Sequence, residues 1–346
     1  GSRHKNLHNW AWNENYDNPL FTESYETLRR TGAEVTVELD QPYYTHQVNR
    51  KIFLTTTGFV QYLKRSALVL ERFAWWKLRG YQKARSYRLR DRLKMSFRQW
   101  RDYETLKRKA VTTVEQMKGR PYVYYPLHLE PEAALQIISP EFFYQLSLIA
   151  AVSRDLPARV SLAVKEAYGA IGRRPDNFYD QITDFNNVFM FETMERGIEC
   201  AQNATAVVTI SGTAGLEAAL AGTPVVTFGH HNIYNPLPHV KVVADERELK
   251  HYLREATERS PEQRAEDKKA GQLLLQAIQQ NSFDMRQYDY VKLKDFDPQA
   301  VADAADFLIR SVSDVENPVL RYPSPDEPVE PVVVRAPSLT TRTEAA

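Results

Sequence analysis

The stretch that decides the fold is Ala206-Val207-Val208-Thr209-Ile210-Ser211-Gly212-Thr213-Ala214-Gly215-Leu216-Glu217. Its first five residues are apolar or β-branched, which is typical of a strand that is covered on both faces. Small residues then interrupt the strand, and helix formers resume at Leu216. Such a turn aims backbone N–H groups and the hydroxyls of Ser211 and Thr213 at one point, where the helix dipole favours an anion. The stretch therefore predicts either an ordinary strand-to-helix turn with a cap or a phosphate site.

The same alternation of short strands and helices continues on either side of this stretch. Strands are expected at residues 122–125, 159–164, 187–191, 206–210 and 224–228. Helices are expected at residues 141–152, 176–184, 193–203, 214–221, 246–257, 261–281 and 298–312. Alternating elements of these lengths predict an α/β fold, a doubly wound parallel sheet with helices on both faces. We therefore predict one Rossmann-like domain over residues 119–312.

The rest of the chain differs in composition from this domain. Residues 1–58 are mixed and aromatic-rich, and residues 34–39 alternate in the way a strand does. Residues 59–118 contain no proline and a single glycine, Gly80, and they predict two or three helices. Residues 313–346 are rich in proline, glutamate and threonine without periodicity, so we predict a disordered tail.

Positive charge is concentrated in the predicted helical segment. Residues 64–109 hold sixteen lysines and arginines against four acidic residues, so they carry +12 in a chain whose formal net charge is +1. Aromatic residues are interleaved with the bases, and Val69, Phe73 and Trp76 fall on one helix face. The segment is either a charged connector that pairs with acidic surface of the same chain, or a contact for an anionic membrane surface or glycan. Nucleic acid suits the same mixture but lacks any accompanying motif, which makes it an unlikely partner.

Length, cysteine content and hydropathy limit the class of protein. The chain has 346 residues, of which 43% are hydrophobic, enough for a substantial core or two domains. The single cysteine, Cys200, excludes a disulfide framework within one chain and favours a reducing compartment, and we expect it to be buried in a helix. No apolar run is long enough to span a bilayer, and no signal peptide is visible. We therefore expect a cytoplasmic protein, with peripheral association at the inner face of the membrane through residues 59–118.

Polar side chains follow the expected strands at the edge where a doubly wound sheet binds its ligands. They are His128, Glu130, Glu132, Lys165, Glu166, Arg173, Arg174 and the turn that begins at Ser211. Basic side chains offset phosphate charge, carboxylates accept hydrogen bonds from sugar hydroxyls, and a histidine can donate to a leaving phosphate. Each residue alone could be solvated or structural, but together they favour an anionic, sugar-bearing ligand. His230-His231 lacks the spacing of a metal pair, so we expect no metal and no cofactor.

These motifs resemble those of the capsule-polysaccharide-synthesis glycosyltransferases, the group that includes bacterial β-Kdo transferases. The matching pieces are residues 124–132, 164–166, 172–179, 211–217 and 224–229. The resemblance covers about residues 120–245, in the order and spacing of the family. It implies a GT-B-like architecture of two Rossmann-type halves with the nucleotide sugar between them, in which the matched half binds the donor.

The resemblance also implies roles for individual residues. Ser211 and Thr213 are expected to hold the donor phosphate, and Lys165, His128 and Glu132 are expected to line the donor pocket. Glu217, one turn into the helix, is a candidate to contact the ribose or to support the residues that do. The full predicted site comprises His128, Glu132 and Glu130 as catalytic residues, with Lys165, Glu166, Arg173, Ser211, Gly212, Thr213 and Glu217 as donor-binding residues.

Two features depart from the family pattern. The family usually continues the Lys-Glu pair with His-Pro, whereas this chain has Ala167-Tyr168. That histidine is associated with the nucleotide phosphate, so its replacement implies weakened donor binding or an altered donor. The acceptor-side half is not recognisable before residue 120, and residues 1–58 are interpreted as a remnant or partial copy of that module.

The leading hypothesis is a glycosyltransferase that moves a sugar from a nucleotide-activated, CMP-Kdo-like donor onto a cell-surface polysaccharide or glycolipid acceptor. One alternative is a catalytically degenerate glycosyltransferase-like binding module, which the Ala167-Tyr168 pair favours. Another is a nucleotide-sugar epimerase, which also uses a turn of small residues before a helix. Retention of His128 and of Ser211-Gly212-Thr213 favours an enzyme.

Overall fold

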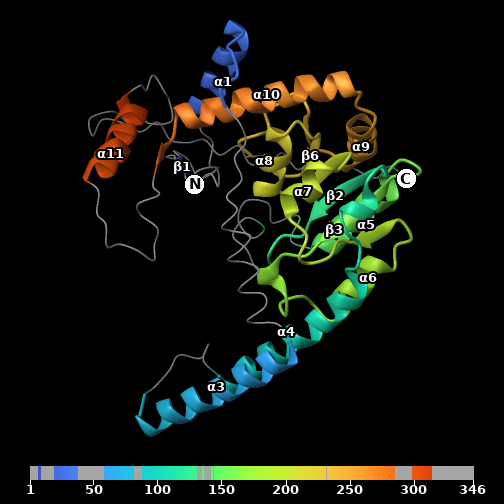
Figure 1. Cartoon of the computed structure of the whole chain (residues 1–346), viewed down its shortest axis with the longest axis vertical. Coiled ribbons are helices and arrows are strands. Elements are labelled where there is room, and N and C mark those ends of the chain that lie inside the picture. Colours follow the sequence, from blue (N-terminus) through green and yellow to red (C-terminus); the bar gives the residue numbers. More distant parts are fainter. Residues whose placement is uncertain are drawn as a thin grey trace, which may run out of the picture.

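A six-stranded parallel sheet forms the centre of the molecule (Figure 1). The computed structural model describes residues 7–8, 19–37, 58–81, 88–130, 135, 142, 144–230, 232–284 and 298–313. The strands of the sheet are β2 (Tyr122–Pro126), β3 (Ser161–Lys165), β4 (Val188–Met190), β5 (Ala206–Thr209), β6 (Val225–Thr227) and β7 (Val240–Val242). Two short strands, β1 (Leu7–His8) and β8 (Phe283–Asp284), pair separately and antiparallel.

The strand order is β4-β3-β2-β5-β6-β7, and every neighbouring pair is parallel. The chain therefore builds outward from β2 to β4, returns to the centre, and builds outward in the other direction from β5 to β7. This is a doubly wound sheet, which confirms the predicted fold class. Its switch point lies between β2 and β5, where the order reverses and where such sheets bind ligands.

All five expected strands are present, within one or two residues of their predicted ends. The sixth, β7, has the sequence Val240-Lys241-Val242 and is half-exposed at the sheet edge. Along β2, Val123 and Tyr125 face one core cluster, whereas Tyr122 and Tyr124 face the other. Because successive side chains of a strand point to opposite faces, a strand buried on both faces must be apolar throughout.

Helices cover both faces of the sheet. Those on one face are α5 (Gln145–Asp155), α6 (Phe178–Thr183) and α9 (Leu249–Thr257). Those on the other are α7 (Gly197–Gln202), α8 (Thr213–Leu220) and α10 (Pro261–Gln280). The last begins with a capping box, in which Ser260 and Gln263 exchange side-chain hydrogen bonds, and with Pro261 at its first position.

Cys200 lies in α7 and is fully buried, as expected. Burial raises the pKa of its thiol to about 12, so the thiol stays protonated and behaves as a small apolar side chain.

The described part of residues 1–58 includes α1 (Pro19–Thr31), which packs on α10 with Phe21 and Tyr25 buried. The strand expected at residues 34–39 is wrong over its described part, because residues 34–37 have no regular secondary structure. Val35 and Val37 pack into the core cluster, and Thr36 N–H donates to Gln276 Oε1 of α10 at 3.3 Å. The alternation thus reflects packing against a helix and not pairing in a sheet.

The basic segment is helical, as predicted. It forms α3 (Phe59–Leu78), α4 (Leu89–Lys109) and a short 3₁₀ turn at Glu115–Met117. In Figure 1, α3 and α4 lie side by side and extend away from the sheet as one hairpin. Beyond β8, α11 (Pro298–Ser313) is the last described element, and the predicted tail lies outside the described residues after its first position. None of the described helices has the length and apolar character needed to cross a bilayer.

The close approach of α10 to α8 gives a prediction about stability. A Cβ at Gly271 would lie 2.5 Å from the Ala219 carbonyl oxygen, a contact that only backbone movement could relieve. Gly271→Ala gains up to about 1 kcal/mol of helix propensity, but overpacking costs about 1–3 kcal/mol. We expect a net loss in the free energy of unfolding, measured by urea denaturation. Lys269→Ala, on the exposed side of the same helix, is the control and should change it by less than about 0.5 kcal/mol.

Candidate functional site

The switch point brings together two of the predicted site residues. His128 follows β2 and Ser211 follows β5, and these two strands pair directly. Ser211 N–H donates to His128 Nε2 at 3.2 Å, and the same nitrogen also contacts the Ser211 carbonyl oxygen. Thr209 Oγ1, at the end of β5, lies 3.5 Å from His128 Nε2. The imidazole therefore sits directly on the strand-to-helix turn.

The turn itself depends on glycine. Gly212 has φ 124° and ψ 178°, a backbone region that only glycine adopts without strain, and it is the N-cap residue of α8. A Cβ there would lie 3.8 Å from His128 Nε2, so the lack of a side chain also keeps this corner open. No side chain caps α8. The first N–H groups of a helix have no intrahelical acceptor, so those of Thr213, Ala214 and Gly215 are available.

Two side-chain atoms at the same place are buried without a hydrogen-bond partner among the described residues. They are His128 Nδ1 and Ser211 Oγ. The residues that carry them are 9% and 8% exposed, respectively. A buried polar group without a partner costs about 1–3 kcal/mol, so folded proteins rarely retain two of them side by side. The corner is therefore equipped to bind something that accepts hydrogen bonds.

The backbone of His128 is held from the other face of the sheet. Its N–H donates to Gln145 Oε1 at 2.8 Å, and its carbonyl oxygen accepts from Gln145 Nε2 at 3.1 Å. Arg174 Nη2 donates to the same carbonyl oxygen at 2.7 Å. Three hydrogen bonds to the backbone of this one residue fix the position of its imidazole.

Arg174 is fully buried and is the centre of an ion cluster. Its Nε and Nη2 bond the two carboxylate oxygens of Glu166 at 2.8 and 2.7 Å, and its Nη1 lies 3.2 Å from Glu130 Oε2. Tyr179 Oη donates to Glu166 at 2.9 Å, and Ala167 N–H does so at 2.7 Å. Burial alone would lower the pKa of Arg174, but the charges of Glu166 and Glu130 raise it. Glu166 is thus occupied by protein donors and serves to position the neighbouring loops.

Lys165 ends β3 and is only 7% exposed. Its Nζ lies 3.4 Å from the Glu166 carbonyl oxygen and 5.2 Å from the centroid of the Tyr168 ring. Burial lowers the pKa of this ammonium, while Cys200 and acidic neighbours oppose the shift. Among the described residues no carboxylate forms an ion pair with it. A buried cation of this kind is a strong attractor for an anion.

The sequence comparisons identify the family of the chain. The family model of the capsule polysaccharide biosynthesis protein matches residues 61–281, well over half of the chain. The chain belongs to this family. The matched residues 61–281 include every predicted site residue. They also include α4 and all of α3 except its first two residues. No curated protein matches the chain.

Three solved structures resemble this member of the capsule polysaccharide biosynthesis family. KpsC of Thermosulfurimonas dismutans, a β-Kdo 2,4 transferase, has 12% identity and a TM-score of 0.30, over 50% of this chain and 56% of that one. The KpsC β-Kdo 2,7 transferase of the same organism has 16% identity and a TM-score of 0.29, over 63% of this chain and 61% of that one. A chain in the structure of accessory secretory proteins 1, 2 and 3 of Streptococcus pneumoniae has 11% identity and a TM-score of 0.29. The match covers 60% of this chain and 38% of that one. The chain thus spans between about two fifths and three fifths of these relatives.

The remaining predicted residues are dispersed. Thr213 opens α8 and Glu217 lies one turn further on, and both are half-buried. Arg173 is exposed, and the adjacent Arg174 enters the cluster instead. Glu132 lies outside the described residues.

Sequence reasoning assigned no role to Gln145 or Tyr179, and it counted Arg174 only among the edge bases that would offset phosphate charge. Arg174 and Tyr179 lie within the motif at residues 172–179, so the motif marked them without separating them from their neighbours. Gln145 acts on the backbone of His128, and no pattern in the sequence announces such a contact.

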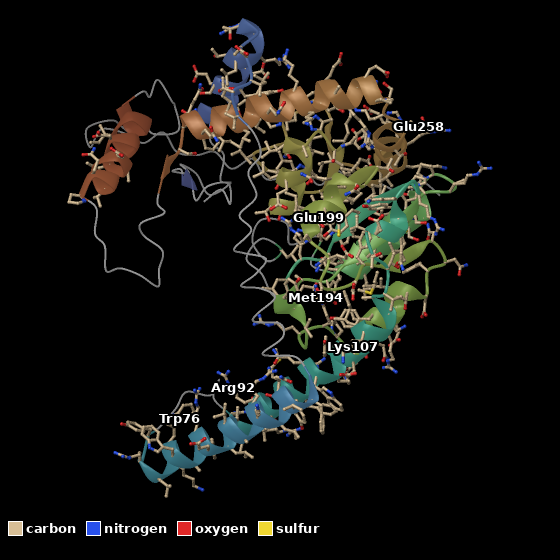
Figure 2. The ribbon with its side chains drawn as sticks, in the orientation of Figure 1. Trp76, Arg92, Lys107, Met194, Glu199 and Glu258 are labelled. Carbon is tan, nitrogen blue, oxygen red and sulfur yellow. The ribbon has the colours of Figure 1, made fainter. Side chains whose placement is uncertain are left out.

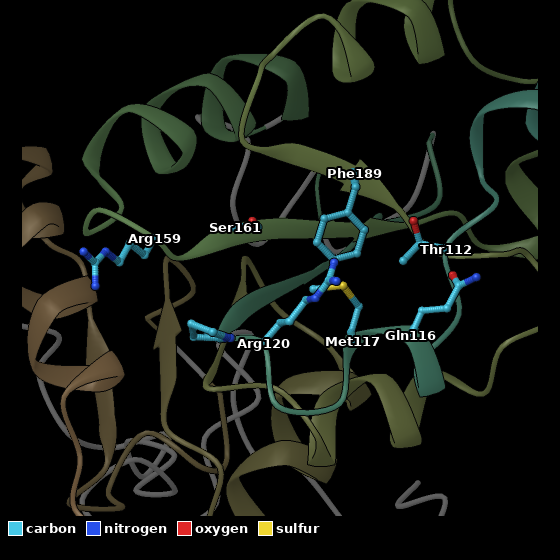
Figure 3. Close-up of a pocket in the computed structure, with 8 residues that line it drawn as sticks. Thr112, Gln116, Met117, Arg120, Arg159, Ser161 and Phe189 are labelled. Atoms are coloured by element: carbon cyan, nitrogen blue, oxygen red, sulfur yellow. The ribbon is translucent and has the colours of Figure 1, made fainter.

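A pocket of about 690 Å³ lies elsewhere, at the amino ends of β2 and β3 and beside Phe189 of β4 (Figure 3). Its lining residues are Thr112, Gln116, Met117, Arg120, Pro121, Arg159, Ser161 and Phe189. It lies at the wrong end of the strands for the ligand site of a doubly wound sheet. The described residues contain no group of three or more metal-ligating side chains.

The ion cluster gives a prediction about folding. Arg174→Met leaves Glu166 and Glu130 without their cation, and breaking a buried pair costs about 3–5 kcal/mol. We expect the free energy of unfolding to fall by that amount in urea denaturation. Arg173→Met is the matched control, because its exposed side chain should contribute less than about 0.5 kcal/mol. Equal losses in the two variants would show that the cluster does not hold the site.

Burial of His128 gives a prediction about pH. Burial lowers the pKa of this imidazole in the folded state, so the unfolded chain binds more protons below about pH 7. The contribution of neutral His128 to the unfolding free energy is therefore fully present above the unfolded pKa. It is lost as the pH falls from there through the lower folded pKa. His128→Gln should flatten the fall in unfolding free energy between about pH 7 and pH 5. Part of the fall should remain in this variant, because burial also lowers the pKa of His239. His230→Gln, at an exposed position, should leave the slope unchanged.

Proposed function

We propose that the switch-point corner binds the phosphate of a nucleotide-activated sugar, and that the protein transfers this sugar to a cell-surface polysaccharide or glycolipid. One observation carries the proposal: His128 Nδ1 and Ser211 Oγ are buried beside the uncapped N-terminus of α8, without a partner among the described residues. Phosphate oxygens accept hydrogen bonds and carry negative charge. They would satisfy both side chains and the free N–H groups of the helix at once.

The charges around the corner support an anionic donor. The N-terminus of a helix behaves as about half a positive charge. Lys165 ends β3, two strands away from β5 in the sheet, and adds a buried amino group that has no carboxylate partner among the described residues. A CMP-activated acidic sugar of the Kdo kind presents a phosphate and a carboxylate, which match these two positive centres. Family membership and the motif resemblance favour the same donor class.

The geometry favours a specific role for His128. The proposal uses the tautomer in which Nε2 accepts the Ser211 N–H, so that the proton of the neutral ring lies on Nδ1. Burial lowers the pKa of the ring, so it is neutral at pH 7. In this proposal Nδ1–H donates to the phosphate oxygen as the bond between that oxygen and the anomeric carbon breaks. His128 therefore stabilises the leaving phosphate by a hydrogen bond in preference to giving it a proton.

The proposed transfer also needs a group that takes the proton from the acceptor hydroxyl as its oxygen bonds the anomeric carbon. Glu130 and Glu132 are the candidates in this chain. Glu130 is shared between Arg174 and Gln145, which leaves it less available as a base. Glu132, which is also predicted from the sequence to be catalytic, is therefore the favoured candidate.

A second candidate function is a binding module without transferase activity. Tyr168 favours it, because its ring lies against Lys165 at the position where the family usually has proline. In that case the corner would bind an anionic glycan or nucleotide without turnover.

Ligand-dependent stabilisation tests the proposal. We expect one of CMP, UDP, GDP or their sugars to raise the melting temperature of the full chain, since a ligand at a hundred times its Kd adds about 2.7 kcal/mol. His128→Ala should lose most of this shift and lower any turnover by about 10²–10³-fold. His230→Ala, an exposed histidine on a neighbouring loop, is the matched control and should retain both.

The variant Ala167→His with Tyr168→Pro separates the two candidate functions. Stronger nucleotide binding in this variant would identify a complete pocket that these two residues weaken. If neither the parent nor this variant binds a nucleotide while both remain folded, the transferase proposal is wrong and the binding module stands.

A further inference from the structure

Among the described residues, the hairpin of α3 and α4 contacts the body at one end. Its attached end is held by ion pairs: Arg98 and Arg101 bond Asp176 at 3.4 and 2.8 Å, and Lys109 bonds Asp180 at 2.8 Å. These contacts fit the connector that the sequence suggested. Figure 2 shows Lys107 beside the body, whereas Trp76 and Arg92 lie far out along the hairpin.

The two helices contact each other through aromatic rings. Phe59 and Tyr62 of α3 lie 5.4 and 5.6 Å from the ring of Trp100 in α4, and Phe97 lies 5.7 Å from it. Because the start of α3 meets the second half of α4, the helices run in opposite directions. The contact uses one side of α3 and leaves its other side to solvent.

The outer side of α3 is apolar and exposed. α3 has no buried residue, and its exposed residues Val60, Leu63, Leu70 and Leu78 share one face at helical spacing. Leu78 is 87% exposed, and Trp75 is 47% exposed. Exposed apolar residues gathered on one face mark a surface that binds a membrane or another protein.

The free end of the hairpin is also strongly basic. Residues 68–94 hold nine lysines and arginines against two acidic residues. The exposed bases there are Arg92 and six further described residues, which are Arg72, Lys77, Arg79, Arg88, Arg90 and Lys94. None of these six forms an ion pair with a described carboxylate, in contrast to the bases at the attached end.

We propose that the described residues at the free end of this hairpin, 68–81 and 88–94, dock on an anionic lipid surface. The apolar side chains and Trp75 enter the interface, and the bases bind acidic headgroups. Charge decides between this occupant and a second copy of the chain. A second copy would bring two basic hairpins together, whereas an anionic surface neutralises them. The inference does not depend on the proposed donor.

Vesicle binding by the full chain tests the proposal. We expect co-sedimentation with phosphatidylcholine vesicles that contain phosphatidylglycerol, and little with phosphatidylcholine alone. Binding should weaken steeply with salt, because exposed charges are screened over about 10 Å at 0.1 M. Arg79→Gln with Arg90→Gln should weaken it about 25-fold, at roughly fivefold per base.

Apolar variants and matched controls complete the test. Trp75→Ser with Leu78→Ser should weaken vesicle binding at least tenfold, with circular dichroism unchanged because neither side chain is buried. The controls are Tyr144→Ser and Arg154→Gln, exposed residues on the body, which should bind as the parent does. The proposal is overturned by binding that ignores lipid charge, by equal losses in the controls, or by no binding. Tighter binding to RNA or an acidic polysaccharide than to vesicles, or a dimer that Leu78→Ser dissociates, would also overturn it.

Discussion

The hydrogen bond between Ser211 N–H and His128 Nε2 is the interaction on which the site depends. It joins the loops that follow β2 and β5, the strands between which the sheet reverses its winding. For the bond to form, β5 must end in a turn tight enough to bring a backbone N–H against the imidazole, and that turn needs the positive φ of Gly212. The same geometry leaves Nδ1, the Ser211 hydroxyl and the first N–H groups of α8 together. A single local constraint thus creates both the tight turn and its capacity for an anion.

The support for this corner comes from the opposite face of the sheet. Arg174 bonds Glu166, Glu130 and the His128 carbonyl oxygen together, so the loops after β2 and β3 are fixed relative to each other. Such a cluster contributes position more than net stability, because the cost of burying three charges offsets their attraction. The departure at Ala167-Tyr168 lies beside this support. Ala167 still donates its N–H to Glu166, and Tyr168 lies against Lys165, so the loop keeps its anchor while the surroundings of the buried cation change.

The sequence predicted the layers of the fold because burial on both faces leaves a visible trace in the strands and in their spacing from the helices. It missed β7, whose central residue is a lysine at a half-exposed edge. It assigned a strand near Val35 and Val37, because the same alternation serves packing against α10. For the site, the sequence marked the turn and His128 but chose Arg173, since nothing in two adjacent arginines tells which one faces inward. Gln145 and Arg174 position His128 by donating to its backbone carbonyl oxygen. Every residue has such a carbonyl, so no residue type in the sequence indicates this contact.

Amide hydrogen exchange of the full chain, with and without the nucleotide that stabilises it most, tests the central claim most directly. The account predicts that bound nucleotide slows exchange at Thr213, Ala214 and Gly215, the N–H groups that a phosphate would occupy, and leaves Arg120 and Arg159 in the distant pocket unchanged. Binding that slows exchange around that pocket, or anywhere else while the α8 amides exchange as before, would contradict it.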